Sequence, residues 1–526
     1  MPFSVVTAGS SLQLVHTDGA IATVTLPANS YVVSGLRPRF SILERNVIVV
    51  NALSRALWLD PDGFAYPLAI PTPNKAPTVA AGAAGALTGT FRVKVAYAIK
   101  NSLGAIIAEG GRSVASLTVT VAAQLIALTN IPKSADPSIN CRRLYRTATG
   151  PGTEYFEWFD IDDNTTTSYS DDAADADLSL FSAQTDLGAA PARLELCAEW
   201  KGRLWGKSTS EPDTLRYSAD GKLYAWPATN SLKVLPVGKD RLGITAIIPR
   251  RDELGIARRD IIWKVIGSAN NDFRMVKLVE GKGAIAPDSV IVSRDVARWL
   301  AEDGVYEWDG EGVRCISDMQ VHPWFSTDTY FNRALFPSAF ARYDPLKHSY
   351  DLFLAPAGGT DFTRWVSFDI SRKCWLGPHK TDAFTPTGAG VIFDANEVLV
   401  PVVCGGDSYV YSVTPGTYRD GAATAVDFDV TGKFHSGNAP DITHYWGQMA
   451  ILTKVETGGT LSIVPKVGRL NAVAGATVSH DLTTGRERLR RLGVGPLCQI
   501  RFQNAEANRS CEIFGYEMPM HEIGRR

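Results

Sequence analysis

Acidic and amide side chains between residues 160 and 172 form the clearest set of groups that could bind an ion. The stretch reads DIDDN at 160–164, and Asp171 and Asp172 follow it. Carboxylate oxygens at alternate positions are the ligands that a calcium-binding loop supplies. Such a loop also needs glycine at its sixth position, where Thr165 stands, and a final glutamate, where Asp171 falls. The sequence therefore favours an acidic, solvated turn, with ion binding as the open alternative.

Motifs for catalysis, metal binding and phosphate binding are missing from the sequence. The eight histidines never pair as His-x-x-x-His, and no GxSxG elbow or GxxxxGK[ST] loop occurs. The seven cysteines include no Cys-x-x-Cys pair, so we expect reduced thiols that pack as small apolar side chains. We predict no catalytic residue, no cofactor-binding residue and no metal ligand, and we expect a protein that is not an enzyme.

An aromatic stretch, WKGRLWGKSTSEPDTLRYSADGKLYAWP at 200–227, resembles the Ser-x-Asp-x-Gly-x-x-Trp turn of sialidase-type propellers. Here Ser218, Asp220 and Gly221 place the glycine one residue early. Such turns close a hairpin, whereas a glycosidase also needs paired carboxylates in one pocket. We therefore interpret Asp220-Gly221 as a hairpin turn. The aromatic residues predicted to fill wedges between sheets are Trp200, Trp205, Tyr217, Tyr224 and Trp226.

A basic segment, GRERLRRLGVGPLCQIRF at 485–502, could contact DNA phosphates or an acidic protein surface. The planar guanidinium group suits both kinds of partner. Because the whole chain is nearly neutral, an interface with a neighbouring domain or subunit is favoured over nucleic acid. The arginines concerned are Arg486, Arg488, Arg490, Arg491 and Arg501.

Length and charge set the broad class of the protein. One hydrophobic core stops growing at about 250 to 300 residues, so a chain of 526 residues predicts several domains. The balance of 53 basic against 55 acidic residues argues against a basic groove that grips phosphates and against a polybasic membrane anchor. No basic leader and no apolar run of about 18 residues is present, so we expect a soluble protein made in a cytoplasm.

Short alternating or β-branched runs, separated by Gly, Pro, Asp and Asn, predict an all-β fold. Examples are NVIVVN at 46–51 and RDIIWKVIG at 259–267. The best candidate for a helical turn or two is SRDVARWLAEDG at 293–304.

Weak repeats predict an interrupted β-propeller of about six blades. Strand cores recur at roughly 45 residues, the length of a four-stranded blade. Pro-rich and Ala/Gly-rich stretches after residue 70 mark an insertion whose short strands suit a fibronectin-like β-sandwich. The predicted domains are N-terminal strands with the first blade, the inserted sandwich, the remaining blades and a C-terminal β-domain, at residues 1–76, 77–187, 188–425 and 426–526.

Three stretches carry a resemblance to a known family. They are CAEWKGRLWGKSTSEPDTLRYSADGKLYAW at 197–226, RRLYRTATGPGTEYFEWFDIDDNTTTSYSDD at 142–172 and RERLRRLGVGPLCQIRFQNAEANRSCEIFGYEM at 486–518. They are similar to the recurring blade, the fibronectin-like insertion and the terminal β-domain of tail nozzle proteins of short-tailed double-stranded DNA bacteriophages. These proteins are also called tail tubular protein B-like or packaged-DNA stabilisation proteins.

The resemblance implies a structural protein of the virion, synthesised in the bacterial host cytoplasm. It implies a homo-oligomeric ring, a hexamer, that extends the channel of the portal and its adaptor. The ring would retain packaged DNA and conduct it during ejection, without sequence-specific binding. The other implied partners are a portal-adaptor protein and a tail fibre, spike or needle protein; no cofactor and no membrane span is implied.

Two alternatives stay open. One is a carbohydrate-binding or glycan-cleaving propeller of a phage tail, which needs a tryptophan-lined pocket with convergent carboxylates. The other is a different phage connector or hub. For the nozzle we expect the inserted sandwich and terminal domain to supply contacts, partly through exposed aromatics at Tyr155, Phe156 and Trp158.

Overall fold

The regular secondary structure of the computed structural model is almost entirely β-strand, which confirms the all-β prediction. In the described part, the one α-helix is α1 (Asp318–Ser326), and the 3-10 segments are η1 (Asp175–Asp177), η2 (Pro287–Ser289) and η3 (Arg333–Ser338). The structure describes the chain except for residues 1–2, 19, 29, 31, 33–36, 151, 180–186, 237–242, 269–271, 382–383, 395, 397, 408, 413–418, 421–423, 426–427, 432–433, 437–441, 470–473, 505–510, 512 and 526.

The chain divides into two compact units. The larger unit comprises residues 1–379 and 386–410, and the smaller unit comprises residues 380–385 and 411–526.

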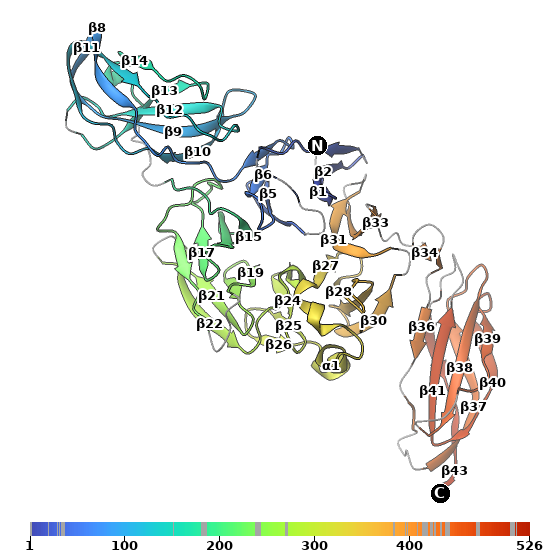
Figure 1. Cartoon of the computed structure of the whole chain (residues 1–526). Coiled ribbons are helices and arrows are strands. Elements are labelled where there is room, and N and C mark those ends of the chain that lie inside the picture. The colour runs from blue at the N-terminus through green and yellow to red at the C-terminus, as the bar shows by residue number, and fades with distance from the viewer. Residues whose placement is uncertain are drawn as a thin grey trace. The chain divides into compact units, whose positions relative to one another are not determined.

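Six antiparallel sheets follow one another in the larger unit in a propeller-like arrangement (Figure 1). Each sheet is a meander, because its strands pair in chain order. The strands are β4 (Arg39–Leu43), β5 (Asn46–Val50), β6 (Leu57–Leu59) and β7 (Ala65–Pro67); β15 (Leu194–Trp200), β16 (Arg203–Ser208), β17 (Thr214–Tyr217) and β18 (Ser231–Lys233); β19 (Ala246–Pro249), β20 (Leu254–Ala257), β21 (Ile261–Ile266) and β22 (Arg274–Glu280); β23 (Ile291–Ser293), β24 (Val296–Leu300), β25 (Val305–Trp308) and β26 (Val313–Cys315); β27 (Phe340–Asp344), β28 (Ser349–Leu354), β29 (Arg364–Asp369) and β30 (Cys374–Lys380); and β31 (Pro386–Phe393), β32 (Leu399–Gly405) and β33 (Val410–Ser412).

The first strands of successive sheets contact one another, from β4 to β15 and onward through β19, β23, β27 and β31. A further three-stranded sheet comes from the N-terminal residues, and its strand β1 contacts β31. Leu12 and Leu14 of this sheet pack with Val49 and Leu57 of the β4–β7 sheet. The N-terminal sheet therefore contacts both the last and the first of the six. Its strands are β1 (Phe3–Ala8), β2 (Ser11–His16) and β3 (Ile21–Thr23).

Aromatic side chains fill the spaces between neighbouring sheets. Three of the five predicted wedge residues, all on the β15–β18 sheet, pack with Leu254 and Val265 of the next sheet. The other two pack in or against a cluster that contains Ile48 and Trp58 of the β4–β7 sheet. Twisted sheets that meet at an angle leave a tapered space, and large flat side chains fill it without voids. The wedge-filling role is confirmed for Trp200, Trp205, Tyr217, Tyr224 and Trp226.

Residues 293–304 contain the strand β24 with a turn on either side, so the predicted helical turn is wrong. Arg294 and Asp295 have φ values of 49° and 63° and turn the chain between β23 and β24. The consecutive residues Trp299 and Leu300 point into two different hydrophobic clusters. A strand buried on both faces lacks the alternation of apolar and polar residues, which is why its sequence could be mistaken for a helix.

The inserted segment between β7 and β15 forms a β-sandwich, as predicted from its short strands. A four-stranded sheet, in the order β10–β9–β12–β13, packs on a three-stranded sheet, β14–β11–β8. The core between them includes Phe91, Val95, Val121 and Leu144. The strands are β8 (Thr78–Phe91), β9 (Val93–Lys100), β10 (Ile106–Arg112), β11 (Val119–Thr129), β12 (Cys141–Arg146), β13 (Phe156–Ile161) and β14 (Tyr169–Asp171).

The sandwich also packs on the β4–β7 and β15–β18 sheets. Its Tyr97 and Ile99 share one hydrophobic cluster with Leu68 and Trp226. Strand β10 comes so close to the linker that a Cβ atom on Gly110 would lie 2.7 Å from the Pro71 carbonyl oxygen. The insertion is therefore built into the core of the larger unit.

The smaller unit is a second sandwich. Its two sheets have the orders β36–β41–β38–β39 and β40–β37–β42, and β43 also pairs with β37. Trp446, Met449, Ile463 and Phe502 lie in the core between them. The sequence placed the start of this domain at 426, whereas the compact unit comprises residues 380–385 and 411–526 and includes a short pair of strands ahead of residue 426. The strands are β34 (Arg419–Asp420), β35 (Thr424–Ala425), β36 (Phe428–Thr431), β37 (Ile442–Thr453), β38 (Thr460–Gly468), β39 (Val478–Asp481), β40 (Arg486–Gly495), β41 (Leu497–Asn504), β42 (Ile513–Glu517) and β43 (Met520–Arg525).

Candidate interaction sites

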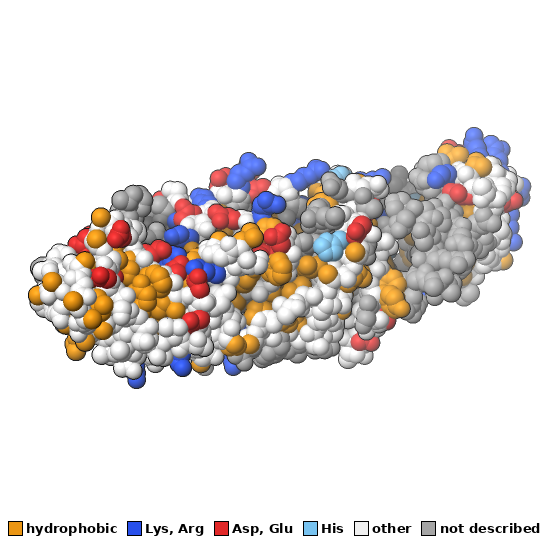
Figure 2. Space-filling model, turned by 90° about the horizontal axis from the view of Figure 1, so that it is seen from above, with side chains coloured by type: hydrophobic (Ala, Val, Ile, Leu, Met, Phe, Trp, Pro, Cys, Tyr) orange, Lys and Arg blue, Asp and Glu red, His pale blue; other side chains and the backbone are white. Residues whose placement is uncertain are grey.

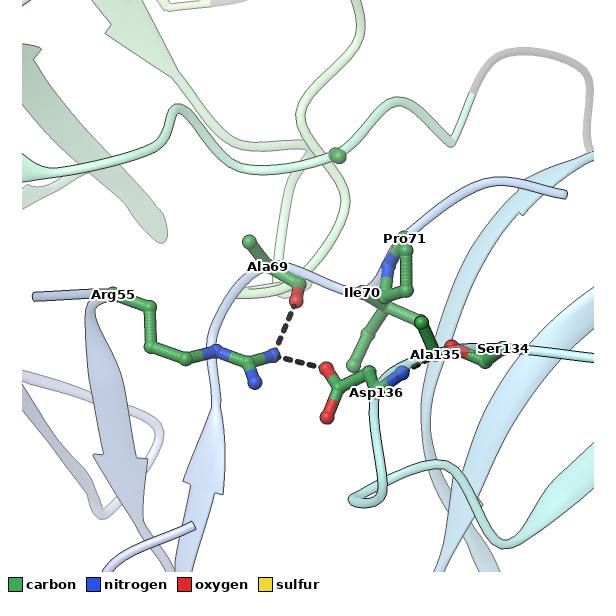
Figure 3. Close-up of a pocket in the computed structure, with 8 residues that line it drawn as sticks. Arg55, Ala69, Ile70, Pro71, Ser134, Ala135 and Asp136 are labelled. Carbon is green, nitrogen blue, oxygen red and sulfur yellow. Dashed lines mark hydrogen bonds and ion pairs between the residues drawn. The ribbon is translucent and has the colours of Figure 1, made fainter. Parts of the chain in front are cut away.

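A pocket of about 420 Å³ lies where the insertion meets the β4–β7 sheet (Figure 3). Arg55, from the segment between β5 and β6, crosses it and donates to Asp136 Oδ2 at 2.6 Å and to the Ala69 carbonyl at 3.1 Å. Burial raises the pKa of Asp136, but hydrogen bonds from Arg55 and Ser138 outweigh this and hold the pKa below its usual value. The remaining lining residues are small or apolar, namely Ala69, Ile70, Pro71, Ser134, Ala135 and Ala189.

The ion pair in this pocket holds the insertion against the β4–β7 sheet. The residues that line the pocket include no nucleophile with a side-chain base beside it. Sequence reasoning missed it, because Arg55 and Asp136 are 81 positions apart and neither belongs to a motif. The Pro-rich linker at 71–77 was the one signal that pointed to this place.

The acidic run at 160–172 is engaged by basic side chains of the same sandwich. Arg143 Nε donates to Asp160 at 2.9 Å, and Arg142 Nη2 donates to Asp163 at 2.7 Å. Of the described residues, no group of three or more His, Cys, Asp or Glu side chains is placed to hold a metal ion. The solvated-turn interpretation therefore holds only in part: Arg143 lies directly opposite Asp160 on the paired strand, whereas the side chain of Asp162 is 70% exposed.

Asp163 closes its own turn by accepting hydrogen bonds from Thr166 Oγ1 and from the amides of Thr166 and Thr165. These bonds, together with Arg142, hold the pKa of Asp163 well below its usual value. A lowered carboxyl pKa stabilises the fold above the pKa of the unfolded chain, about 3.9, and this stabilisation is lost as pH falls.

We expect the sandwich to lose stability between about pH 5 and pH 2, and Asp163→Asn to lose less over that range because asparagine does not titrate. Thermal unfolding of both proteins across this range measures the difference. Equal pH profiles would contradict the assignment.

Arg146 and Asp171 form an ion pair in which both side chains are fully buried, with Nη1 and Oδ2 2.9 Å apart. Arg146 Nη2 also reaches Asp175 at 3.1 Å, and its guanidinium lies 4.9 Å from the ring centroid of Phe91. Burial raises the pKa of Asp171, although Arg146 and the Ala173 amide oppose the shift. The pair joins β12 to β14 and so ties the two sheets of the sandwich together.

Asp220 and Gly221 form a tight turn, as predicted, but the turn lies within the connection between β17 and β18 and closes only the isolated bridge between Ala219 and Lys222. Gly221 has a φ of 61°, and the Lys222 amide donates to the Ala219 carbonyl at 3.2 Å. Ser218 Oγ accepts from the Leu204 amide at 3.0 Å, which anchors the turn to β16. The side chain of Asp220 is 73% exposed, so this carboxylate points to solvent.

Replacing Gly221 with valine is expected to lower the free energy of unfolding by about 1 to 3 kcal/mol, because a β-branched residue avoids positive φ. A new Cβ would also lie 3.0 Å from Glu44 Oε1. Gly221→Asn should cost less, because asparagine tolerates the left-handed region. Chemical denaturation compares the two; equal losses would argue against a conformational cause.

The tryptophans of the 200–227 stretch are buried and cannot form a sugar-binding platform. Trp205 and Trp226 are fully buried, and Trp200 is 3% exposed. Phe273, which sequence reasoning missed, contacts the rings of Trp200 and Trp205. It lies outside any recognisable motif, just before β22.

The aromatics expected on the surface of the insertion are not exposed. Tyr155 is buried beneath Lys94, whose Nζ lies 4.5 Å from the ring centroid. Trp158 packs against the sandwich core, and Phe156 is half-buried. Phe159, one position along β13 from Trp158, is the exposed aromatic, at 40%. Side chains alternate along a strand, so Trp158 and Phe159 face opposite sides.

The basic segment at 485–502 forms two strands that belong to different sheets. Strand β40 carries four exposed arginines. Arg501 is on β41, where it lines a separate pocket of about 350 Å³ with Lys466 and Gln499. The five arginines therefore form a row of four and a separate residue.

The cysteines and the buried His480 are held in packed or hydrogen-bonded environments. All seven cysteines are free, and burial raises the pKa of the Cys197 and Cys498 thiols to about 12, so both stay protonated near neutral pH. His480 is held between Glu487, at 2.7 Å, and Thr453, at 2.9 Å. Among the described residues, no helix is long and apolar enough to cross a membrane.

No family model matches the chain, and no curated protein matches it. Among solved structures, a chain in a crystal structure of a mitotic checkpoint complex is similar with a TM-score of 0.30 and 7% identity, over 74% of this chain and 93% of that chain.

Proposed function

We propose that this protein is a structural component of a bacteriophage tail, a nozzle that forms a hexameric ring. The ring extends the channel of the portal and its adaptor, retains packaged DNA and conducts it into the host. In this proposal the seven contacting sheets of the larger unit close into a propeller. The protein works as part of the virion and is not an enzyme.

The order of parts along the chain is the observation that supports this proposal most. A β-sandwich interrupts the propeller-like sheets after the β4–β7 sheet, and a second sandwich follows the last sheet. The three stretches that resemble nozzle proteins fall in the β15–β18 sheet, in the inserted sandwich and in the terminal sandwich.

The surface chemistry is compatible with a conduit. Basic and acidic side chains are interspersed on the face seen in Figure 2. Clustered cations bind DNA tightly because they release counterions, so a wall of mixed charge lets DNA pass. The proposed function requires no nucleophile, metal ion or cofactor.

Single-particle imaging of the purified full-length protein tests the proposal. A closed ring of identical copies, with an axial channel wide enough for duplex DNA, is the expected result. A monomer that binds host polysaccharide would instead support the carbohydrate-binding alternative. A ring that occupies another position in the phage tail would make the protein a different connector or hub.

The insertion is proposed to supply contacts between copies or to neighbouring tail proteins. Deleting it would expose Trp58 and Trp226, with which it shares a core, so a surface change is the sharper test. Val114 and Leu117 are 66% and 88% exposed on one loop of the insertion. Replacing both with glutamate should weaken ring formation while thermal stability is retained, and full-size rings would contradict this role.

A further inference from the structure

We propose that strand β40 of the smaller unit is a binding site for the phosphate backbone of nucleic acid. The site is the arginine row, defined as Arg486, Arg488, Arg490 and Arg491. This inference rests on the row itself and does not depend on the ring.

The row lies on an edge strand. Strand β40 pairs with β37 on one side only, and its Leu489 packs into the core of the sandwich. Arg486, Arg488 and Arg490 are at alternate positions, which places them on one face at intervals of about 6.8 Å. A register shift between Gln448 and Ala450 of β37 gives β40 an extra residue between Arg488 and Arg491, and Arg491 is exposed as well. Four of the six residues from 486 to 491 are therefore exposed arginines.

Acidic groups nearby do not neutralise the row. Among the described residues, no carboxylate lies within ion-pair distance of its four guanidinium groups. Glu487, which lies within the row, faces His480 at 2.7 Å, and Glu456 faces Lys454 at 3.8 Å. Arginines elsewhere in the chain are placed differently, for example Arg143 and Arg298, which have carboxylate partners at 2.9 Å.

The contacts that the row makes within the smaller unit do not neutralise its positive charge, so this charge can bind a ligand. The guanidinium of Arg490 donates to the Ala476 carbonyl, which accepts a hydrogen bond without neutralising the charge. The guanidinium of Arg491 lies 5.9 Å from the ring centroid of Tyr445. Four adjacent like charges repel one another, so the row gains free energy from a ligand with repeated negative charge.

A phosphate backbone fits this row better than a protein surface does. It presents one negative charge at every nucleotide, so successive arginines find acceptors whatever the base sequence. A protein interface has an apolar centre from which charges are depleted. Because four of the six residues from 486 to 491 are exposed arginines without a carboxylate partner among the described residues, phosphate is the ligand that this chemistry favours.

The test uses the full-length protein and fluorescence anisotropy with a labelled mixed-sequence DNA duplex and the matching RNA duplex. The variant Arg486→Gln/Arg488→Gln/Arg491→Gln removes three charges from the row. It keeps Arg490, whose guanidinium donates to the Ala476 carbonyl. The control Arg251→Gln/Arg274→Gln/Arg372→Gln removes the same charge from three exposed arginines of the larger unit. Thermal midpoints of both variants should match the wild type.

The β40 variant should bind at least about tenfold more weakly in dilute salt, and the slope of log affinity against log salt should fall by about 2.7, or about 0.9 per lost phosphate contact. The control should bind like the wild type. A similar loss of affinity for the DNA and RNA duplexes supports a site for phosphate. A larger loss with the DNA duplex identifies DNA as the nucleic acid that supplies the phosphates. Equal losses in both variants, or wild-type binding to poly-L-glutamate but to neither duplex, would overturn the inference.

The result is separable from the proposed function. A monomer that binds duplexes through β40 would overturn the nozzle and leave this site standing. A ring that binds neither duplex would support the nozzle and overturn the phosphate site on β40.

Discussion

Trp205→Ala is expected to lower the free energy of unfolding of the larger unit by about 3 to 5 kcal/mol. Trp205 is fully buried between the β15–β18 and β19–β22 sheets. Its ring stacks on Tyr217 with centroids 4.4 Å apart and meets Phe273 edge-on at 5.1 Å. Its Nε1 donates to the Trp200 carbonyl at 3.1 Å, so truncation leaves a cavity and removes this hydrogen bond.

Chemical denaturation, with hydrogen exchange over residues 194–280, measures this loss and locates it in the two sheets. Trp365, which is only partly buried, provides the matched control, and Trp365→Ala should cost clearly less. A loss below about 1 kcal/mol for Trp205→Ala would mean that the tryptophan does not hold the two sheets together.

Arg146→Met is expected to destabilise the inserted sandwich by about 3 to 5 kcal/mol at neutral pH, because it leaves Asp171 buried without its partner. The loss should shrink at acidic pH. A buried carboxyl with a raised pKa stabilises the fold below the pKa of the unfolded chain and loses that contribution as pH rises. The double variant Arg146→Met/Asp171→Leu should recover part of the loss.

Hydrogen exchange over residues 78–171, at pH values on both sides of 4, measures these effects. Lys277 and Glu280 form an exposed pair, with side chains 55% and 52% exposed, so Lys277→Met serves as the control and should change stability by less than about 1 kcal/mol. A double variant that is no more stable than Arg146→Met would show that other contacts of Arg146 carry the effect.

Local sequence patterns predicted the strands, the tight turn at Gly221 and the aromatics between sheets. In each case a few neighbouring residues determine the outcome: positive φ favours glycine, and large aromatic side chains are stable in a buried wedge. Val296–Leu300 was mistaken for a helix because both faces of that strand are buried, which removes the alternation that identifies a strand.

Contacts between residues far apart in the sequence could not be predicted from local sequence patterns. The acidic run was visible in the sequence, but its arginine partners on β12 became evident only when β12 and β13 were paired. The joint between Arg55 and Asp136 likewise depends on how the insertion packs. The arginines of β40 were recognised, but their separation from Arg501 depends on β40 and β41 joining different sheets, which a local sequence pattern does not specify.

The hydrophobic cluster shared by the insertion and two sheets has a consequence for synthesis of the chain. Leu68 leaves the ribosome long before Trp226, its partner in that cluster, and at about 5 to 20 residues per second the delay is roughly 8 to 30 s. The inserted sandwich emerges during this interval, and its Tyr97 and Ile99 belong to the same cluster. By folding first, the sandwich would cover the apolar face of the β4–β7 sheet until the β15–β18 sheet has been synthesised. It would thereby protect the incomplete chain from aggregation.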